Sequence, residues 1–333
     1  MNKPTRILIS GTYFSGSSAV TDFLSEFDGV FRIPGEFDDF RRIGLVGDSL
    51  IYPPVPYPLR FNEYISKNRN YSFVSNVFGG AGGRRGAIHR TVDRLLDALL
   101  SLRGLKKNNR RGLDALEEYA KKNYSVGSFE EKLILAKEWL SEVERLNCDG
   151  ENFQYLLFDQ PIFHGQHQNI WPRVFDPYKL IIVIRDPLDQ LAQLVGNRNY
   201  CLDHSTCLTH GIHEIYGSGS TGMINYQLAA LSGRYRSILE LIEIIPEKQI
   251  LIIPFEDLVN QYSIYTEKLM SFITGKKMNL EHSRPMEFFD PKISCKNIGI
   301  SKGFESEFKD ADAKIMSQVM ELHHKLLDGS MLK

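Results

Sequence analysis

The sequence has few cysteines, no long apolar run and no excess of charge of either sign. Its four cysteines are scattered among 333 residues, so they form no disulfide framework and favour a reducing, cytoplasmic environment. Apolar stretches such as residues 250–254 are far shorter than the roughly 20 residues that cross a bilayer, and no secretory signal precedes the first expected strand. The 40 basic and 41 acidic residues lack the positive surplus of a general nucleic-acid binder. We therefore expect a cytoplasmic protein with no transmembrane segment and no nucleic-acid partner.

Short runs rich in Ile, Leu and Val alternate along the chain with stretches of helical periodicity. Buried strands are expected at residues 6–10, 153–158, 179–184 and 249–254, and helices at residues 17–27, 187–195, 223–245 and 256–274. Strands that alternate with helices form βαβ units, so the sequence predicts a P-loop-like, three-layer α/β fold, a parallel sheet with helices on both faces. The charged segment at about 84–147, with helical patterns at 90–102, 113–122 and 129–146, is expected to be a helical insertion in a single domain of residues 1–333.

The most informative stretch is a β-branched strand followed by a loop rich in glycine and serine and then by a helical pattern. The loop contains Gly11, Phe14, Ser15, Gly16, Ser17 and Ser18. Glycines allow a sharp turn, and the first N–H groups and positive dipole end of the new helix then point at one place. This pattern predicts a phosphate or sulfate site, with an ordinary strand-to-helix turn as the alternative. The Gly-Lys-Ser/Thr ending of a Walker loop is absent.

A second polar position follows another expected strand. The run at 179–184 ends in Arg185, and Asp186 and Pro187 then begin the next helix. The planar guanidinium presents a fork of donors suited to phosphate, whereas the alternative is an Arg–Asp ion pair that ties the strand end to the helix. Ligands of parallel sheets bind beyond the carboxyl ends of the strands, where the Gly/Ser loop also lies.

These motifs, together with residues 251–259 and 297–303, resemble the sulfotransferase family that uses 3′-phosphoadenosine 5′-phosphosulfate (PAPS). The family's 5′-phosphosulfate loop is similar to residues 13–18, and its 3′-phosphate strand is similar to the strand ending in Arg185. The resemblance covers almost the whole chain in the right order. It implies transfer of a sulfuryl group from PAPS, without a metal, to a hydroxyl or amine. It further implies that Gln193 helps bind the 3′-phosphate and that Lys302 and Gly303 close over the nucleotide.

The chain departs from the family at two lysines. Phe14 stands where the family has Lys or Arg, and residues 158–161 lack the second lysine. Such a cation stabilises the charge that develops on the leaving phosphate, so its loss leaves a catalytically impaired nucleotide-binding homologue as an alternative. The candidate replacements are Arg6, Lys302 and, preferred, Arg84 and Arg85 after a glycine-rich stretch.

An acceptor hydroxyl needs a base to take its proton. Glu36 lies where carbohydrate and protein-tyrosine members of the family carry a catalytic glutamate, and the resemblance implies this role for it. His164 is the second candidate, because cytosolic members use a histidine. The neighbouring Asp38 and Asp39 leave an acidic surface loop as the alternative for Glu36. A glutamate base weakly favours a glycan or lipid-linked sugar over a small-molecule acceptor, and a homodimer is compatible with this interpretation.

Three further features leave other functions open. Asp159 could hold Mg²⁺ in a phosphotransferase that uses ATP. Cysteines and histidines recur every third residue over 201–213, a pattern that could bind zinc but lacks the usual structural pairs, so exposed or acceptor-facing histidines are preferred. An aromatic group could line an acceptor cleft or form core; it comprises Phe61, Tyr64, Tyr71, Phe73 and Phe78.

Overall fold

The computed structural model describes residues 4–42, 44–51, 59–66, 108–148, 153–196, 219–275 and 280–331. The chain divides into two compact units. The first unit comprises residues 1–32, 154–168 and 177–333, and the second comprises residues 33–153 and 169–176. The expectation of one domain stays a prediction.

Five strands form one sheet in the order β2-β3-β1-β4-β5. They are β1 (Thr5–Gly11), β2 (Val30–Glu36), β3 (Tyr155–Asp159), β4 (Tyr178–Ile184) and β5 (Ile250–Pro254). β1 pairs in parallel with β3 and with β4, and β4 pairs in parallel with β5. The four predicted strands are confirmed. Sequence patterns missed β2, because it is an edge strand whose exposed half contains Pro34 and Gly35.

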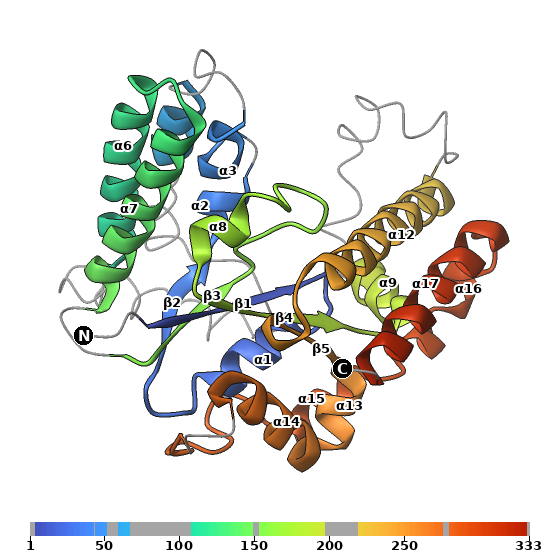
Figure 1. Cartoon of the computed structure of the whole chain (residues 1–333). Helices are drawn as coiled ribbons and strands as arrows, with labels where there is room; N and C mark the ends of the chain where they lie inside the picture. Colours follow the sequence, from blue (N-terminus) through green and yellow to red (C-terminus); the bar gives the residue numbers. More distant parts are fainter. Residues whose placement is uncertain are drawn as a thin grey trace, which may run out of the picture. The chain divides into compact units, whose positions relative to one another are not determined.

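Helices cover both faces of the sheet in the first unit (Figure 1). On one side lie α1 (Ser17–Leu24), α13 (Phe255–Asn260), α14 (Tyr262–Thr274) and α15 (Pro291–Ser294); on the other lie α9 (Pro187–Gly196), α12 (Gly219–Ile244), α16 (Glu305–Phe308) and α17 (Ala313–Met331). Short 3₁₀ turns are η1 (Glu247–Gln249), η2 (Cys295–Asn297) and η3 (Ile300–Gly303). The predicted three-layer α/β fold is thereby confirmed. Among the described helices, none is long and apolar enough to cross a bilayer.

The strands are buried on both faces because both faces carry helices. Ile7 and Ile9 point into one core with Phe23 of α1 and Leu258 of α13. Leu8 lies between them in sequence, points to the opposite face and is equally inaccessible. This double burial explains why the strands read as continuous apolar runs rather than as alternating patterns.

Two predicted helices end or break earlier than their periodicity suggests. α1 stops at Leu24, three residues before the predicted end, because the chain turns there toward β2. The stretch predicted as one helix over 256–274 is two helices, since Gln261 adopts φ −122° and ψ 42° between α13 and α14. Apolar periodicity continues across such a break and so does not reveal it.

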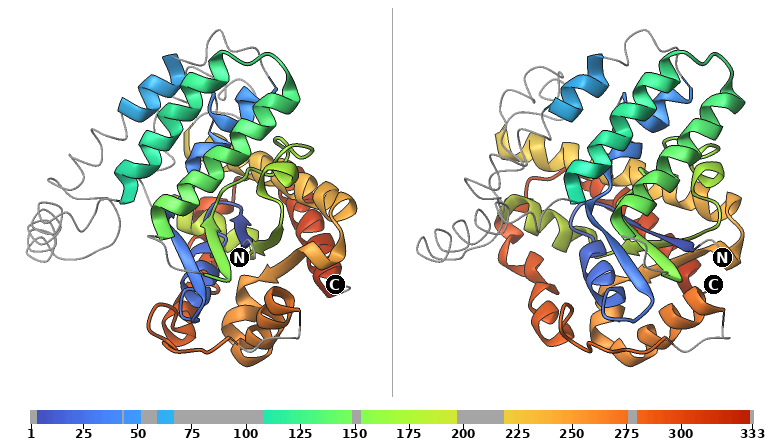
Figure 2. Two further views of the ribbon diagram at one scale, coloured as in Figure 1. Left: turned by 60° about the vertical axis from the view of Figure 1, so that its left-hand side comes forward. Right: turned by 90° about the vertical axis from the view of Figure 1, so that its left-hand side faces the viewer.

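The second unit is a small helical assembly. Its helices are α2 (Asp38–Arg41), α3 (Val46–Ser49), a helical stretch at 59–66, α6 (Asn108–Tyr124), α7 (Phe129–Cys148) and α8 (Trp171–Phe175). α6 and α7 lie side by side (Figure 2), which confirms the helices predicted at 113–122 and 129–146. Ser128 and Glu131 form a reciprocal capping box at the start of α7, with Oγ 2.6 Å from the carboxylate. The helix predicted at 90–102 lies outside the described residues.

Candidate functional site

The loop between β1 and α1 is a tight turn that leaves the start of α1 uncapped. Ser15 N–H donates to Thr12 O at 3.2 Å, and the flanking Phe14 and Gly16 both have positive φ, 52° and 87°. A Cβ on Gly16 would lie 2.3 Å from the Phe255 ring, so only glycine fits. No side chain of the described residues caps α1, and its first turn holds no acidic residue. Ala19 N–H donates to Gly16 O at 2.9 Å, so the N–H groups of Ser17 and Ser18 are those that can bind an anion.

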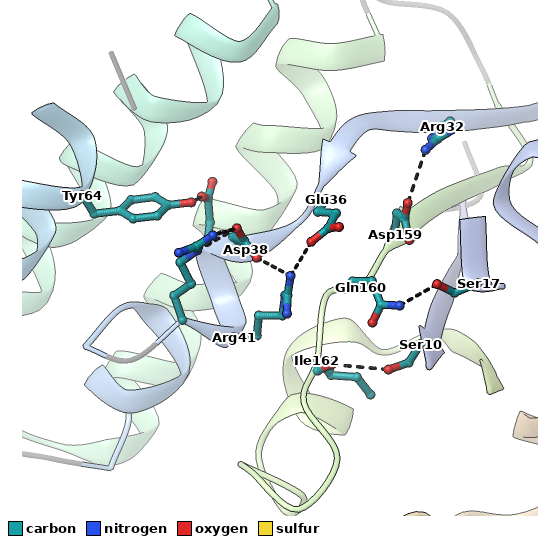
Figure 3. A network of polar contacts seen from close by, with 12 residues as sticks. Ser10, Ser17, Arg32, Glu36, Asp38, Arg41, Tyr64, Asp159, Gln160 and Ile162 are labelled. Carbon is teal, nitrogen blue, oxygen red and sulfur yellow. Dashed lines mark hydrogen bonds and ion pairs between the residues drawn. The ribbon is translucent and has the colours of Figure 1, made fainter. Parts of the chain in front are cut away.

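The serines of the loop occupy different positions. The Ser15 hydroxyl is buried against Gly11 and has no hydrogen-bond partner in the described part of the chain. Ser17 Oγ accepts a hydrogen bond from Gln160 Nε2 at 2.7 Å (Figure 3), which connects the loop to the end of β3. Ser18 faces a cavity beside α1. A buried hydroxyl without a partner is costly, and Gly11 leaves the space that the Ser15 hydroxyl occupies.

The cavity beside the loop has a volume of about 390 Å³. Its lining includes Phe14, Gly16 and Ser18 of the loop, Arg185 and Gln193. The rest of the lining comprises Ala19 and Asp22 of α1, the apolar Phe255, Met286, Phe288, Phe289 and Ile293, and the polar Glu287, Asp290, Ser294 and Asn297. Volumes of this size hold drug-sized ligands, and a polar end opposite an apolar wall suits a nucleotide.

Arg185 is the one basic residue among the described residues that line this cavity, and 2% of its surface is exposed. One terminal nitrogen donates to Phe14 O at 3.0 Å and to Gln193 Oε1 at 2.5 Å, and the other donates to Asn297 O. Its Nε has no partner among the described residues. Burial lowers the pKa of Arg185, opposed by the charges of Asp189, Glu256 and Asp186. A phosphate in the cavity would supply the missing acceptor.

The expected alternative for Arg185, an ion pair with Asp186, is not what the structure has. Asp186 Oδ1 instead accepts the N–H groups of Leu188 and Asp189, at 2.9 and 3.0 Å, and so caps α9. The buried Asp189 carboxylate accepts Gly299 N–H at 2.6 Å and Ser301 N–H at 2.9 Å. It thereby holds the 297–303 segment beside the cavity.

Lys302 and Gly303, which the resemblance places over the nucleotide, lie in η3 and are exposed. Neither residue lines the cavity. Gln193, by contrast, faces it and is in contact with Arg185. Arg185 and Gln193 therefore face the same cavity, whereas their role in binding the 3′-phosphate and the role of Lys302 stay predictions.

A buried polar chain lies on the other side of the loop. Thr12 Oγ1 donates to Gln190 Oε1 at 2.6 Å, and Gln190 Nε2 donates to Arg185 O at 2.7 Å and Tyr235 Oη at 2.9 Å. Beside it, the Arg234 guanidinium lies over the Tyr13 ring, 3.7 Å from the ring centre. Sequence reasoning missed these residues of α9 and α12, because no local pattern connects them with the loop.

His164 belongs to the same unit as the loop. Its Nε2 lies 3.3 Å from Ser10 Oγ at the end of β1, and its Nδ1 is buried without a partner among the described residues. Burial, with the nearby charge of Arg234, lowers the pKa of His164 to about 3. The imidazole is therefore neutral at physiological pH, and its low pKa makes it a weak proton acceptor.

Glu36 belongs to the second unit, at the end of β2. Its carboxylate is exposed and lies 2.7 Å from Arg41, which also contacts Asp38 (Figure 3). The adjacent Asp39 accepts a hydrogen bond from Tyr64 Oη at 2.8 Å, and burial raises the pKa of Asp39 to about 6. The Glu36 carboxylate is therefore exposed and paired with Arg41, and its role as a base stays a prediction.

The structure bears on two expectations: that Asp159 could hold Mg²⁺, and that Arg6 could replace the loop lysine. Asp159, considered above as a Mg²⁺ ligand, is buried and lies 3.3 Å from Arg32, which also pairs with Asp22 at 2.7 Å (Figure 3). Arg6 is not available to replace the loop lysine, because it lies near the start of β1, at the end of the strand away from the loop. Arg84 and Arg85 lie outside the described residues.

Of the aromatic group and the Cys/His stretch, only part of the aromatic group lies within the described residues. Phe61 is buried and lies beside Tyr119, so it is a core residue of the second unit. Tyr71, Phe73 and Phe78 lie outside the described residues, as does the Cys/His stretch at 201–213. Within the described ranges, no group of three or more His, Cys, Asp or Glu is arranged to hold a metal ion.

No protein-family model matches the sequence, and no curated protein matches it significantly. Four solved structures match, all of them sulfotransferases or sulfotransferase domains. The sulfotransferase domain of the Synechococcus PCC 7002 olefin synthase is 13% identical, with a TM-score of 0.48 over 98% of this chain and 94% of that chain. The sulfotransferase domain from the curacin biosynthetic pathway is 13% identical, with a TM-score of 0.46 over 98% of both chains. A sulfotransferase from Alicyclobacillus acidocaldarius is 11% identical, with a TM-score of 0.41 over 97% of both chains. The functional proposal below rests on the residues of this chain.

Proposed function

We propose that this protein is a sulfotransferase that moves a sulfuryl group from PAPS to a hydroxyl or amine of an acceptor. The observation that carries the proposal is the cavity of about 390 Å³ into which the uncapped start of α1 and the buried Arg185 both face. PAPS carries anionic groups at both its 5′ and 3′ positions, so a ligand of this kind uses both anion-binding ends at once.

The cavity residues divide naturally between the two ends of PAPS. The backbone of Gly11–Ser18, with the hydroxyls of Ser15, Ser17 and Ser18, holds the 5′-phosphosulfate. Arg185 and Gln193 bind the 3′-phosphate, and the Nε that lacks a partner gains one. The adenine lies against the apolar wall that includes Phe255 and Phe288. Lys302 and Gly303 close over the nucleotide from η3.

The reaction is an in-line transfer. The acceptor oxygen forms a bond to sulfur, the bond from sulfur to the bridging oxygen breaks, and that electron pair stays on the departing phosphate. Glu36 or His164 takes the acceptor's proton. A glutamate base favours a glycan or lipid-linked sugar as acceptor.

Sulfuryl transfer is preferred over phosphoryl transfer because of Asp159. A phosphotransferase with this fold needs a strand-end carboxylate that holds Mg²⁺. Here the Arg32 guanidinium lies 3.3 Å from that carboxylate and offsets its charge. A metal ion at the same place would have to compete with a resident cation.

Calorimetric binding of adenosine 3′,5′-bisphosphate, with ATP and Mg²⁺ as the comparison, tests the proposal. We expect the bisphosphate to bind, and Arg185→Ala to weaken it by about 100-fold, the value of a buried charge-assisted contact. Arg236→Ala, an exposed arginine on α12, is the matched control and should leave binding unchanged. Circular dichroism would check folding, with Arg185→Lys as a second variant. Binding of ATP–Mg²⁺ alone would overturn the proposal.

A further inference from the structure

One arginine beside the phosphate loop has no role in the function proposed above. Arg234, in α12, places its guanidinium carbon 3.7 Å from the centre of the Tyr13 ring, one residue before Phe14. When a guanidinium stacks on an aromatic ring, its N–H donors still point outward in its plane. Two of them can then donate to two oxygens of the same anion. The charge of Arg234 therefore lies against the loop itself.

The position of Arg234 is fixed by its neighbours. Tyr235 is fully buried, and its hydroxyl donates to Arg185 O at 3.2 Å. Gln190 connects the same hydroxyl to Thr12 of the loop. One turn further along α12, Ser237 packs closely against Gly165, where a Cβ would lie 2.6 Å from Ser237 Oγ. α12 is thus held at two points, against the loop and against the segment after β3.

Arg234 has no acidic partner among the described residues, although its side chain is half-buried. Arg32 of β2, by contrast, has two acidic partners, Asp22 and Asp159. A partly buried cation without a counter-charge is costly unless a ligand supplies one. Its field also reaches His164, whose pKa it helps to lower. The electrostatics on this side of the loop therefore favour an anionic ligand.

We propose that Arg234 is the cation that binds the 5′-phosphosulfate of the donor, in place of the positive charge that Phe14 does not provide. This inference rests on the proposed sulfotransferase function. As the bond between sulfur and the bridging oxygen breaks, its electron pair moves onto the 5′-phosphate, and Arg234 stabilises that charge. The sulfuryl group passes to the acceptor oxygen, whose proton goes to the base, so Arg234 itself neither gains nor loses a proton.

Binding of nucleotide fragments separates this role from that of Arg185. Adenosine 3′-monophosphate lacks the 5′ group, whereas adenosine 3′,5′-bisphosphate carries it. In Arg234→Ala, we expect the affinity advantage of the bisphosphate over the monophosphate to fall by about tenfold or more, the value of one charged hydrogen bond. Affinity for the 3′-monophosphate should stay unchanged. Arg236→Ala, two residues along α12 and exposed, is the matched control.

A second measurement tests catalysis separately from binding. Hydrolysis of PAPS, with water as acceptor, should fall by about 100-fold in Arg234→Ala, as when a charge-stabilising donor is removed. Adding Phe14→Lys to that variant should recover much of the loss. An unchanged advantage of the bisphosphate in Arg234→Ala would overturn the assignment while leaving the sulfotransferase proposal intact. If the wild-type protein bound neither nucleotide, the sulfotransferase proposal would itself fail, and this inference with it.

Discussion

Glu26 is a fully buried carboxylate that organises one wall of the cavity beside α1. Its Oε1 accepts the N–H groups of Phe288 and Phe289, both at 2.9 Å. Its Oε2 accepts Met286 N–H at 3.1 Å and lies 2.7 Å from His282 Nε2. Glu26→Gln keeps one oxygen but places an NH₂ group against a backbone N–H. We expect this change to lower the free energy of unfolding by about 2–3 kcal/mol, the cost of losing charged hydrogen bonds and leaving a buried donor unsatisfied.

The effect of Glu26 should depend on pH in a defined direction. Burial tends to raise the pKa of Glu26, but the hydrogen bonds from Phe289, His282, Phe288 and Met286 together lower it below its usual value of 4.5. The stabilisation is therefore fully present above pH 4.5 and is lost as pH falls through the lowered pKa. The difference between wild type and Glu26→Gln should shrink in acid, because a protonated glutamate resembles glutamine.

Urea unfolding and amide hydrogen exchange would measure these effects. A local loss of 2–3 kcal/mol corresponds to exchange about 30- to 150-fold faster at Phe288 and Phe289. Glu281→Gln makes the same change of charge at an exposed neighbouring position and should be nearly neutral. Equal effects of Glu26→Gln and Glu281→Gln at neutral pH would refute the assigned role of Glu26.

Two further predictions concern the loop and the base. Gly16→Ala should destabilise the protein by about 2 kcal/mol or more and abolish nucleotide binding, because the φ of Gly16 is 87° and Phe255 occupies the space of a Cβ. Gly112→Ala, at an open position inside α6, is the control and should stabilise the protein by about 0.5–1 kcal/mol. Thermal unfolding compares the two, and a neutral Gly16→Ala would contradict the close approach. Glu36→Gln and His164→Asn should separate the candidate bases: the true base loses turnover about 100-fold or more with donor binding kept, and full turnover in both would dismiss both.

The sheet and the loop could be predicted from the sequence because their signals are local. Residues 6–10 and 179–184 are continuous apolar runs, which doubly covered parallel strands require. Arg185 was identified from its place at the end of such a run. β2 was not predicted, because a half-exposed edge strand that contains Arg32 and Pro34 has no such continuous apolar run.

The parts of the site that were missed depend on contacts between distant residues. Glu26 looks like a surface charge at the end of a helix, and only the fold brings it to Phe288, 262 positions along the chain. Arg234 lies in the middle of a long helix with no motif around it. Its contact with Tyr13 arises from the packing of α12, which residue spacing alone does not specify.

The walls of the cavity beside α1 come from segments that lie far apart in the sequence. The loop of Gly11–Ser18 is synthesised well before the segments bound by Glu26 and Asp189. At about 5–20 residues per second, on the order of tens of seconds separate the two on the ribosome. A nascent chain thus has this loop long before it can complete the cavity, and it carries Glu26 without its backbone partners for the same period. The cavity therefore forms only after the segment from Met286 to Asn297 has been synthesised, so chains truncated before Met286 should lack it.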